Sequence, residues 1–385
     1  GSTHFASMQK DQNFWPADMY MEGLDQYRGW FQSSLLVAVG ALGRGAPFKE
    51  CVTHGWTVDG EGKAMHKSLG NGMDPAEIFD KYGADLLRLW AGSADYHVDV
   101  RCSDEIFKQL SQNYLKFRNT CKFCLDNLVG FDADHLVQPD EMLPLDKWAV
   151  TRLNTLIEKV FAAYDNYEFH VVSHMVNDFC VVDLSSFYFD IIKDRLYCGE
   201  ENSLERRSAQ SAVWMILDAM TRLFAPILAF TCDEVWLAMP HRAGDDARNV
   251  LLNQMVQPYT AYALSEEEMG KWARLAALRT AVNGALEQAR ADKTIGKSLE
   301  AEVDLTVTAE DAFLTDMDAA DLADLLIVSQ VRVEVGAEQS VAVRPANGAK
   351  CLRCWKVLPT VGSDAGHPDL CPRCAAVVKN LPVIE

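Results

Sequence analysis

Four cysteines near the end of the chain form two Cys-x-x-Cys pairs, Cys351 with Cys354 and Cys371 with Cys374. Each pair can wrap one side of a tetrahedral metal ion from a tight turn, and the segment between the pairs closes the loop. Four thiolates fill the coordination shell of Zn²⁺ and leave no position for a reactive water. The spacing therefore predicts one structural zinc ion held in a zinc ribbon.

Basic side chains flank these cysteines, namely Lys350, Arg353, Lys356 and Arg373. The chain as a whole is acidic, with a formal net charge of −19, so indiscriminate binding to nucleic acid is not expected. A local basic surface is still sufficient for a specific RNA partner. We expect the four cations to form a basic face on the ribbon, and RNA is a partner that such a face could meet.

A flexible loop over 62–72 holds a second group of side chains with chemical potential. Lys63, Lys67 and Ser68 lie there among glycines. Glycines allow close backbone approach, and ammonium groups neutralise the charge that develops on transferring phosphates, so the loop is suited to closing over a polyphosphate. It does not match the G-x-x-x-x-G-K-[ST] pattern of a Walker loop. A solvated lysine-rich turn is the alternative interpretation.

A third candidate is the polar group Glu22, Gly23, Asp25 and Gln26. A strand that ends in Glu-Gly, followed by Asp-Gln at a helix start, places acid and amide groups at the carboxyl edge of a parallel sheet. Ligands of open α/β sheets bind at this edge. The alternative is that Asp25 only caps a helix.

The elements that position these residues fall into distinct regions of the 385-residue chain. Strand, helix and strand follow one another over 18–56, which indicates an α/β region. From 104 to 292, apolar residues recur every three or four positions and predict an α-helical bundle. Alternating segments at 301–307 and 331–335 predict a small α+β unit, followed by a linker over 344–350. Predicted helices lie at 29–39, 75–82, 84–90, 106–128, 144–164, 171–196, 205–223, 226–239 and 266–292.

Composition excludes some classes of protein. No apolar stretch reaches the roughly 18 to 20 residues that a membrane span needs, and no signal peptide opens the chain. Eleven cysteines, an odd number, suit reduced thiols in the cytoplasm better than a disulfide framework. Cys121 and Cys124 lie on one face of a predicted helix, and we interpret them as small buried hydrophobic residues.

Two further stretches carry a resemblance to a known family. Residues 16–31 match the pattern P-A-D-x-Y-x-E-G-x-D-Q-x-R-G-W-F, and residues 64–71 stand where a K-M-S-K-S signature followed by a hydrophobic residue, Gly and Asn would lie. Together with the terminal cysteines and the adjacent Trp355, they resemble the isoleucyl-tRNA synthetases, which are class I aminoacyl-tRNA synthetases. The resemblance covers essentially the whole chain, in family order.

The resemblance implies a multidomain fold of α/β and α regions. Its parts would be the second half of a Rossmann-type catalytic domain over 1–103, an α-helical stem-contact and anticodon-binding bundle over 104–292, a small α+β junction domain over 293–345 and the zinc ribbon over 346–385. Within the bundle, Arg206 and Arg207 are the strongest candidates for an exposed basic spot, with a solvated helix start as the alternative.

The resemblance also implies an activity. The enzyme would join isoleucine to ATP, with Mg²⁺, and pass the acyl group to the isoleucine tRNA. Glu22, Gly23, Asp25 and Gln26 would line the aminoacyl-adenylate site. Lys67 would bind the ATP phosphates, with Ser68 beside it, and stabilise the departing pyrophosphate by electrostatics. We expect a cytoplasmic monomer that does not enter a membrane.

The sequence departs from the family pattern in two ways. Ala64 and His66 replace the first lysine and the central serine of the signature, and Lys63 is the candidate to supply the missing charge. No His-x-Gly-His motif is present in these residues, and neither is the editing domain that the family inserts. We therefore expect the C-terminal portion of a longer enzyme, inactive alone. A non-catalytic RNA-binding protein and a valyl or leucyl relative remain alternatives.

Overall fold

The computed structural model describes residues 15–381, except for the side chain of Lys67. These residues divide into two compact units. The first is built from the described residues up to Leu115 together with Ala162–His174 and Ile227–Ala229, and the second contains the remainder. The four domain boundaries expected from the sequence stay a prediction, and part of the first expected domain, residues 1–14, lies outside the described residues.

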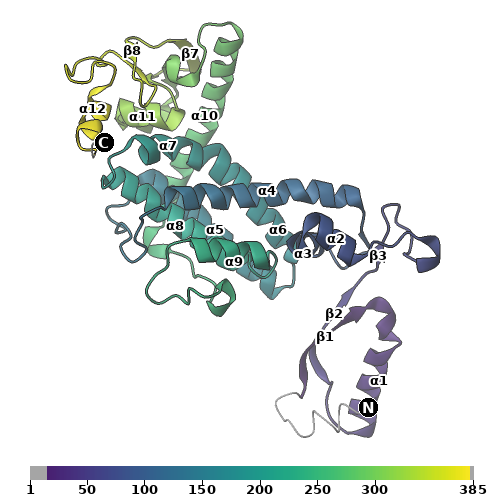
Figure 1. Cartoon of the computed structure of the whole chain (residues 1–385). Coiled ribbons are helices and arrows are strands. Elements are labelled where there is room, and N and C mark those ends of the chain that lie inside the picture. The colour runs from purple at the N-terminus through teal and green to yellow at the C-terminus, as the bar shows by residue number, and fades with distance from the viewer. Residues whose placement is uncertain (1–14, 382–385) are drawn as a thin grey trace. The chain divides into compact units, whose positions relative to one another are not determined.

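The first unit opens with a parallel strand pair, β1 (Ala17–Gly23) and β2 (Phe48–His54), labelled in Figure 1. Helix α1 (Trp30–Leu36) lies between them in sequence and continues as a π-helical turn, Val37–Ala41. The predicted strand–helix–strand order is therefore confirmed. The second strand was predicted at 51–56, but it begins and ends earlier, since Phe48 already pairs with Ala17 and Gly55 leaves the ladder to bond Tyr96.

A second parallel pair follows, β3 (Thr57–Val58) with β4 (Val100–Arg101). The predicted helices between them are present as α2 (Pro75–Tyr82) and α3 (Ala84–Ser93). The first begins at this point because Asp74 accepts a hydrogen bond from Ala76 N and proline occupies the first helical position. It ends at Gly83, whose φ of 81° suits glycine.

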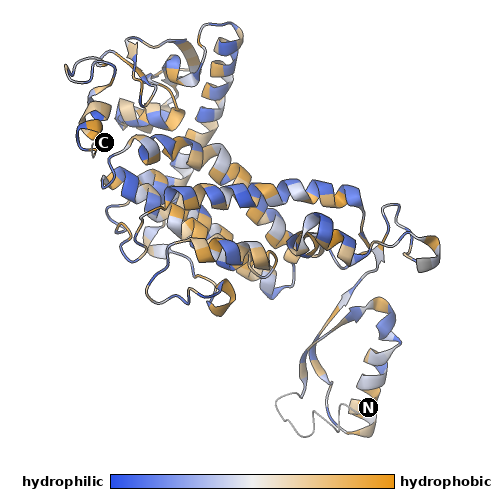
Figure 2. Ribbon diagram, viewed as in Figure 1, coloured by the Kyte–Doolittle hydropathy of each residue, from blue (hydrophilic) through white to orange (hydrophobic). Residues whose placement is uncertain are grey.

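The second unit is dominated by helices that carry hydrophobic and hydrophilic residues together, as Figure 2 shows. Phe117 and Phe123 of one long helix contact Phe224 and Phe189 of two others, with ring centroids 5.0 and 4.3 Å apart, so the apolar stripes form the core. The predicted bundle is confirmed. No helix in the described part of the chain is long and apolar enough to cross a membrane. The helices, some of them shared with the first unit, are α4 (Asp104–Asn127), α5 (Pro144–Asp165), α6 (Phe169–Asp178), α7 (Phe189–Cys198), α8 (Leu204–Phe224), α9 (Ala229–Ala238) and α10 (Glu266–Ala291).

One predicted helix is more complex than its periodicity indicated. The sequence predicts a continuous α-helix over 171–196, but a π-helical segment, Phe179–Tyr188, separates α6 from α7. Ser186 Oγ donates to Val181 O, five residues earlier, at 2.7 Å, which matches the wider π spacing. The apolar pattern of this segment does not reveal the change in backbone hydrogen-bond register. Five of its ten residues are buried whichever hydrogen bonds the backbone makes.

Cys121 and Cys124 are 1% and 0% exposed. Burial raises the pKa of both thiols well above the ordinary range, so they stay protonated and unreactive. Their interpretation as small hydrophobic residues of the helical core is confirmed.

A buried carboxylate network ties three helices of the second unit together. Asp146, fully buried in the first turn of α5, accepts hydrogen bonds from Tyr188 Oη at 2.7 Å and Ser208 Oγ at 2.6 Å. Arg195 Nη1 lies 3.4 Å from the same carboxylate. Leu143 N donates to Ser208 Oγ at 2.9 Å, so the network also fixes the start of α5. Burial raises the pKa of Asp146, and the three partners act against that shift.

We expect Asp146→Asn to destabilise this unit by about 1–3 kcal/mol, because an amide cannot accept from all three donors and leaves at least one buried partner unsatisfied. Urea unfolding followed by far-UV circular dichroism measures the change. Asp134→Asn, at an exposed position near the other end of the preceding loop, serves as the control. Equal midpoints for Asp146→Asn and the parent protein would contradict the prediction.

The predicted small α+β region, which is part of the second unit, contains a three-stranded sheet. The central strand β5 (Ala301–Val307) pairs in parallel with β6 (Gln330–Val335) and antiparallel with β7 (Ser340–Pro345). Helix α11 (Ala319–Leu326) precedes β6 and buries its apolar face. The two predicted strands are confirmed. The predicted linker over 344–350 is wrong at both ends, since Pro345 still pairs with Ala301, and Ala349 and Lys350 already pair with Leu358 and Val357.

Candidate functional site

The four C-terminal cysteines converge as the spacing predicts. All four side chains are buried, and their Sγ atoms lie within 4.8 Å of one another. Zn–S bonds of about 2.3 Å in a tetrahedron place neighbouring sulfurs about 3.8 Å apart. The Sγ atoms of Cys354 and Cys371 are 3.9 Å apart, close to that value. The donor set and its spacing therefore fit one zinc ion.

Local structure explains why the sulfurs meet. The first pair lies on the turn between β8 (Ala349–Lys350) and β9 (Val357–Leu358), two short antiparallel strands. Trp355 adopts a left-handed φ of 66° there and donates its N–H to Cys351 O at 2.9 Å. The second pair opens helix α12 (Pro372–Lys379), with Cys371 as its N-cap residue.

Electrostatics also favour a cation at this point. Burial acts to raise the pKa of Cys351, but backbone N–H groups, including Cys371 N at 3.3 Å, outweigh it and lower that pKa to about 6. Burial raises the pKa of Cys354 and of Cys371. Four sulfurs this close cannot all be thiolates without a divalent ion among them, and Zn²⁺ would supply that charge.

The expected RNA-facing basic surface on the ribbon is largely wrong, because three of its cations are engaged within the protein. Arg353 Nη1 donates to Cys198 O at 2.6 Å, and Arg373 Nη2 donates to Asp194 Oδ1 at 2.9 Å. Lys356 pairs with Asp324. Asp194 and Asp324 lie far away in sequence, so spacing around the cysteines could not reveal them. These cations attach the zinc module to α7 and α11.

In the first unit, secondary structure and hydrogen bonds define the positions of the predicted polar residues. Glu22 lies near the end of β1, where Trp30 Nε1 donates to its Oε1 at 3.4 Å. Asp25 and Gln26 belong to a 3₁₀ turn, Leu24–Tyr27, and Gln26 Nε2 donates to Asp25 Oδ2 at 2.8 Å. The N-cap residues of this turn and of α1 are Gly23 and Gly29, so Asp25 lies inside the turn and is not the cap of either element, which counts against the alternative that it only caps a helix.

Gly29 explains part of this local geometry. A Cβ atom at Gly29 would stand 2.2 Å from Gln26 Oε1, which itself accepts from Trp30 N at 3.2 Å. A side chain at position 29 would therefore displace Gln26 from the turn.

The loop after β3 makes more internal hydrogen bonds than is expected of a flexible lysine-rich turn. Asn71 Nδ2 donates to Asp59 Oδ2 at 2.7 Å and to Ala64 O at 3.1 Å, and Asn71 Oδ1 accepts from His66 N at 2.9 Å. Asp59 also accepts from Lys63 N at 2.8 Å. Because of these donors, led by Asn71, the pKa of Asp59 is lowered. Neither Asp59 nor Asn71 was predicted from the sequence to organise the loop.

The predicted lysines are not equivalent in this loop. Lys63 Nζ lies 2.6 Å from Glu61 Oε2, and both side chains are largely exposed. Lys67 and Ser68 belong to a 3₁₀ turn, Lys67–Leu69, but the Lys67 side chain lies outside the described atoms. Glu22 lies within β1 of the β1–β2 pair, whereas the loop follows β3 of the β3–β4 pair. The sequence also predicts that Glu22 and Lys67 face one shared nucleotide pocket, and this stays a prediction.

The helical bundle offers few exposed aromatic groups of the kind that bind RNA bases. Trp148, Trp214 and Trp236 are at most 7% exposed and belong to the core. Arg206 and Arg207, the expected exposed basic spot, are both only partly exposed. Arg207 donates to Gln210 and Asn202 within the start of α8, which favours the alternative of a helix start.

Three regions of the chain match models of known protein families. Residues 1–103 match the family model of class I tRNA synthetases for I, L, M and V, residues 146–305 match the anticodon-binding domain of tRNA ligases, and residues 348–377 match the zinc finger found in FPG and IleRS. The isoleucine–tRNA ligase of Moorella thermoacetica is 45% identical over 398 aligned positions, which cover 99% of this chain. The chain belongs to the isoleucine–tRNA ligase family.

Other relatives agree with this family assignment. The isoleucine–tRNA ligase of Geobacter sulfurreducens is 46% identical over 94% of this chain. The chain spans only 42% and 40% of the lengths of these two relatives. Methionyl-tRNA synthetase of Mycobacterium tuberculosis, solved in complex with methionyl-adenylate, covers 60% of this chain with a TM-score of 0.51 at 17% identity, and it supports the fold alone. The predicted class I fold with a four-cysteine zinc finger is confirmed.

Proposed function

We propose that the protein acts as an isoleucine–tRNA ligase, activating isoleucine with ATP and Mg²⁺ and transferring it to the isoleucine tRNA. The observation that carries the proposal is the 45% identity to isoleucine–tRNA ligases over nearly the whole chain, with the zinc cysteines in place. Activity in the cytoplasm, as a monomer and away from membranes, belongs to the same proposal. The tRNA, isoleucine and ATP are the proposed partners.

The proposal assigns roles to the residues of the first unit. Glu22, Gly23, Asp25 and Gln26 line the aminoacyl-adenylate site, supported by their place at the carboxyl end of β1 beside the parallel strand β2. Lys67 holds the ATP phosphates, with Ser68 next to it, and Lys63 supplies additional positive charge. Asp59 and Asn71 position the loop that carries these side chains.

Exposed apolar side chains around β1 and α1 support a further part of the proposal, that the active form has more polypeptide packed against this sheet. Met21 and Leu36 are each 63% exposed, and Val39 is 51% exposed. Parallel strands are usually covered on both faces, and a two-stranded parallel sheet lacks that cover. The active form would therefore need additional polypeptide against this sheet, and we expect the chain alone to give no ATP–pyrophosphate exchange with isoleucine.

A chimera tests the function directly. This chain replaces the matching region of the Moorella thermoacetica isoleucine–tRNA ligase, and the purified chimera is assayed for charging of isoleucine tRNA and valine tRNA at a stated salt concentration. We expect isoleucine tRNA to be charged and valine tRNA not. A folded, zinc-containing chimera that charges neither, or prefers valine tRNA, would contradict the proposal. Exchange by the chain alone would refute the need for added polypeptide.

A further inference from the structure

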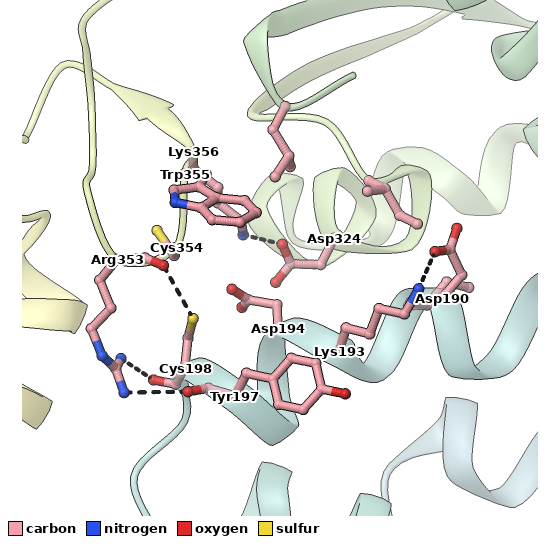
Figure 3. A pocket seen from close by; sticks show the side chains of 13 residues that line it. Asp190, Lys193, Asp194, Tyr197, Cys198, Asp324, Arg353, Cys354, Trp355 and Lys356 are labelled. Carbon is pink, nitrogen blue, oxygen red and sulfur yellow. Dashed lines mark hydrogen bonds and ion pairs between the residues drawn. The ribbon is translucent and has the colours of Figure 1, made fainter. Parts of the chain in front are cut away.

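The side chain of Arg353, which lies between the first two zinc cysteines in sequence, bridges the zinc module and the end of helix α7 within the second unit. Its Nη1 donates to Cys198 O at 2.6 Å, and its Nη2 donates to Tyr197 O at 3.4 Å. Figure 3 shows the guanidinium reaching these carbonyl groups, while Cys198 Sγ donates back to Arg353 O at 3.7 Å. The contact between the module and the helix is therefore made in both directions.

The end of α7 explains why a cation is held at this point. The last four carbonyl groups of an α-helix have no partner within the helix, and the helix C-terminus carries partial negative charge. In α7, Gly199 N donates to Arg195 O. The carbonyls of Tyr197 and Cys198 accept instead from Arg353. A guanidinium has five N–H groups in a fixed fork, so it can serve both carbonyls and still donate elsewhere.

One of the remaining N–H groups reaches a zinc ligand. Arg353 Nη1 lies 3.8 Å from Cys374 Sγ, within hydrogen-bonding range for the large sulfur atom. Cys374 lies in the first turn of α12 and is 0% exposed, so water does not solvate its sulfur. Zn²⁺ with four thiolates stays doubly negative, and a buried charge is costly unless it is paired and hydrogen-bonded. A cationic N–H donor at this sulfur supplies both the charge and the hydrogen bond.

We propose that Arg353 is a positioning residue of the zinc centre. It orients the Cys374 thiolate, balances part of the negative charge of the zinc–thiolate group, and is itself held in place by the end of α7. Hydrogen-bonding partners behind the metal ligands commonly account for roughly 10- to 100-fold in metal affinity. Arg353 thus helps to hold zinc as well as attaching the module to α7. This role follows from the geometry of the module and does not depend on the proposed function.

Arg373 attaches the module to the same helix in a different way. It lies between Cys371 and Cys374 in sequence, and both of its Nη atoms donate to the carboxylate of Asp194 on α7. This pair joins the module to α7 through a carboxylate, whereas Arg353 also donates to a zinc ligand. Weakening the pair at Asp194 therefore loosens the attachment without removing a hydrogen-bond donor from a sulfur.

Zinc affinity of the full chain, measured by competition with a chelator of known affinity at one fixed pH, gives the first test. We expect Arg353→Gln, which removes the positive charge and shortens the donor, to bind Zn²⁺ roughly 10- to 100-fold more weakly than the parent. Arg353→Lys keeps the charge without the planar fork, so its affinity should lie between those of the other two proteins. Arg248→Gln is the matched control, because its side chain is 80% exposed and pairs with Asp246 outside the module.

Replacing zinc with cobalt separates a role at the sulfur from a role in attachment. Co²⁺ bound by four thiolates absorbs light by charge transfer from sulfur to metal, and an N–H donor at a sulfur raises the energy of this transition. Loss of the donor in Arg353→Gln should therefore shift the absorption band to longer wavelength at saturating Co²⁺. Asp194→Asn, which weakens the attachment to α7 but keeps Arg353, should leave the band in place.

A folded Arg353→Gln protein with the zinc affinity of the parent would overturn the proposal. Weaker zinc binding with an unshifted cobalt band would overturn it too, because Arg353 would then act through attachment to α7 alone. Circular dichroism at saturating zinc reports the folding of each variant. If Arg353→Gln does not fold, Arg353→Lys carries the test, and a zinc affinity and cobalt band equal to those of the parent would contradict the role of Arg353.

Discussion

Removing zinc is expected to unfold the segment 348–377 and to release its contacts with α7 and α11. Structural zinc contributes about 10–16 kcal/mol to modules of this kind, and so small a segment has little other core to replace it. The four cysteines, with Leu358, Val361 and Leu370, form most of its buried cluster. Hydrogen exchange after chelation should therefore show loss of protection across this segment.

The variant Cys354→Ser tests the same prediction by replacing one of the proposed zinc ligands. We expect the variant to lose its zinc, measured by mass spectrometry of the metal, and to lose protection at the same residues. Cys51→Ser, which changes an exposed cysteine outside the cluster, is the matched control. A Cys354→Ser protein that keeps one zinc and its protection would show that the site is misassigned.

The zinc site illustrates what local spacing can predict. Two Cys-x-x-Cys pairs fix a tetrahedral site because each pair needs only one turn, and the fold brought all four sulfurs within 4.8 Å. The charge of the surrounding surface did not follow from spacing. Arg373 and Lys356 bind Asp194 and Asp324, which belong to α7 and α11, so their use depends on tertiary docking.

The fold likewise has features that the local sequence predicts and features that depend on residues far away in the chain. Helix α2 occupies its predicted 75–82, because Asp74, Pro75 and Gly83 mark both ends locally. Strand β7 was not predicted, since its main partner β5 lies nearly forty residues earlier and Arg344 is held between Glu302 and Asp304 across that pairing. Pairing over such separations leaves little signal in a short window of sequence.

The two segments proposed to be catalytic show where prediction from motifs goes beyond what the fold alone displays. Glu22 accepts a hydrogen bond from Trp30 of its own motif, and Asn71 of the second motif donates to Asp59, which lies outside both motifs. These hydrogen bonds set the local geometry, whereas Glu22 and Lys67 carry the proposed contacts with substrate. The roles of the motif residues thus depend on a measurement of activity.

In the chimeric enzyme, Lys67→Ala is expected to lower the rate of ATP–pyrophosphate exchange about 10²- to 10³-fold. A preorganised positive charge that acts mainly on the departing pyrophosphate stabilises the transition state more than the bound ATP. The loss should therefore fall mainly on kcat. Steady-state exchange at varied ATP separates this effect from weaker ATP binding, which would raise KM instead.

Lys63→Ala is the matched variant in the same loop, and it decides whether that lysine replaces the charge missing at Ala64. Lys63 is paired with Glu61 in an exposed position, where an ion pair holds a side chain only weakly, so it remains free to turn toward phosphate. If it does, Lys63→Ala should lower exchange measurably but far less than Lys67→Ala. An unchanged rate would remove Lys63 from the proposed site, and an unchanged rate in Lys67→Ala would remove Lys67. Unchanged rates in both variants would remove the loop itself, because no third residue is assigned to supply charge to the phosphates.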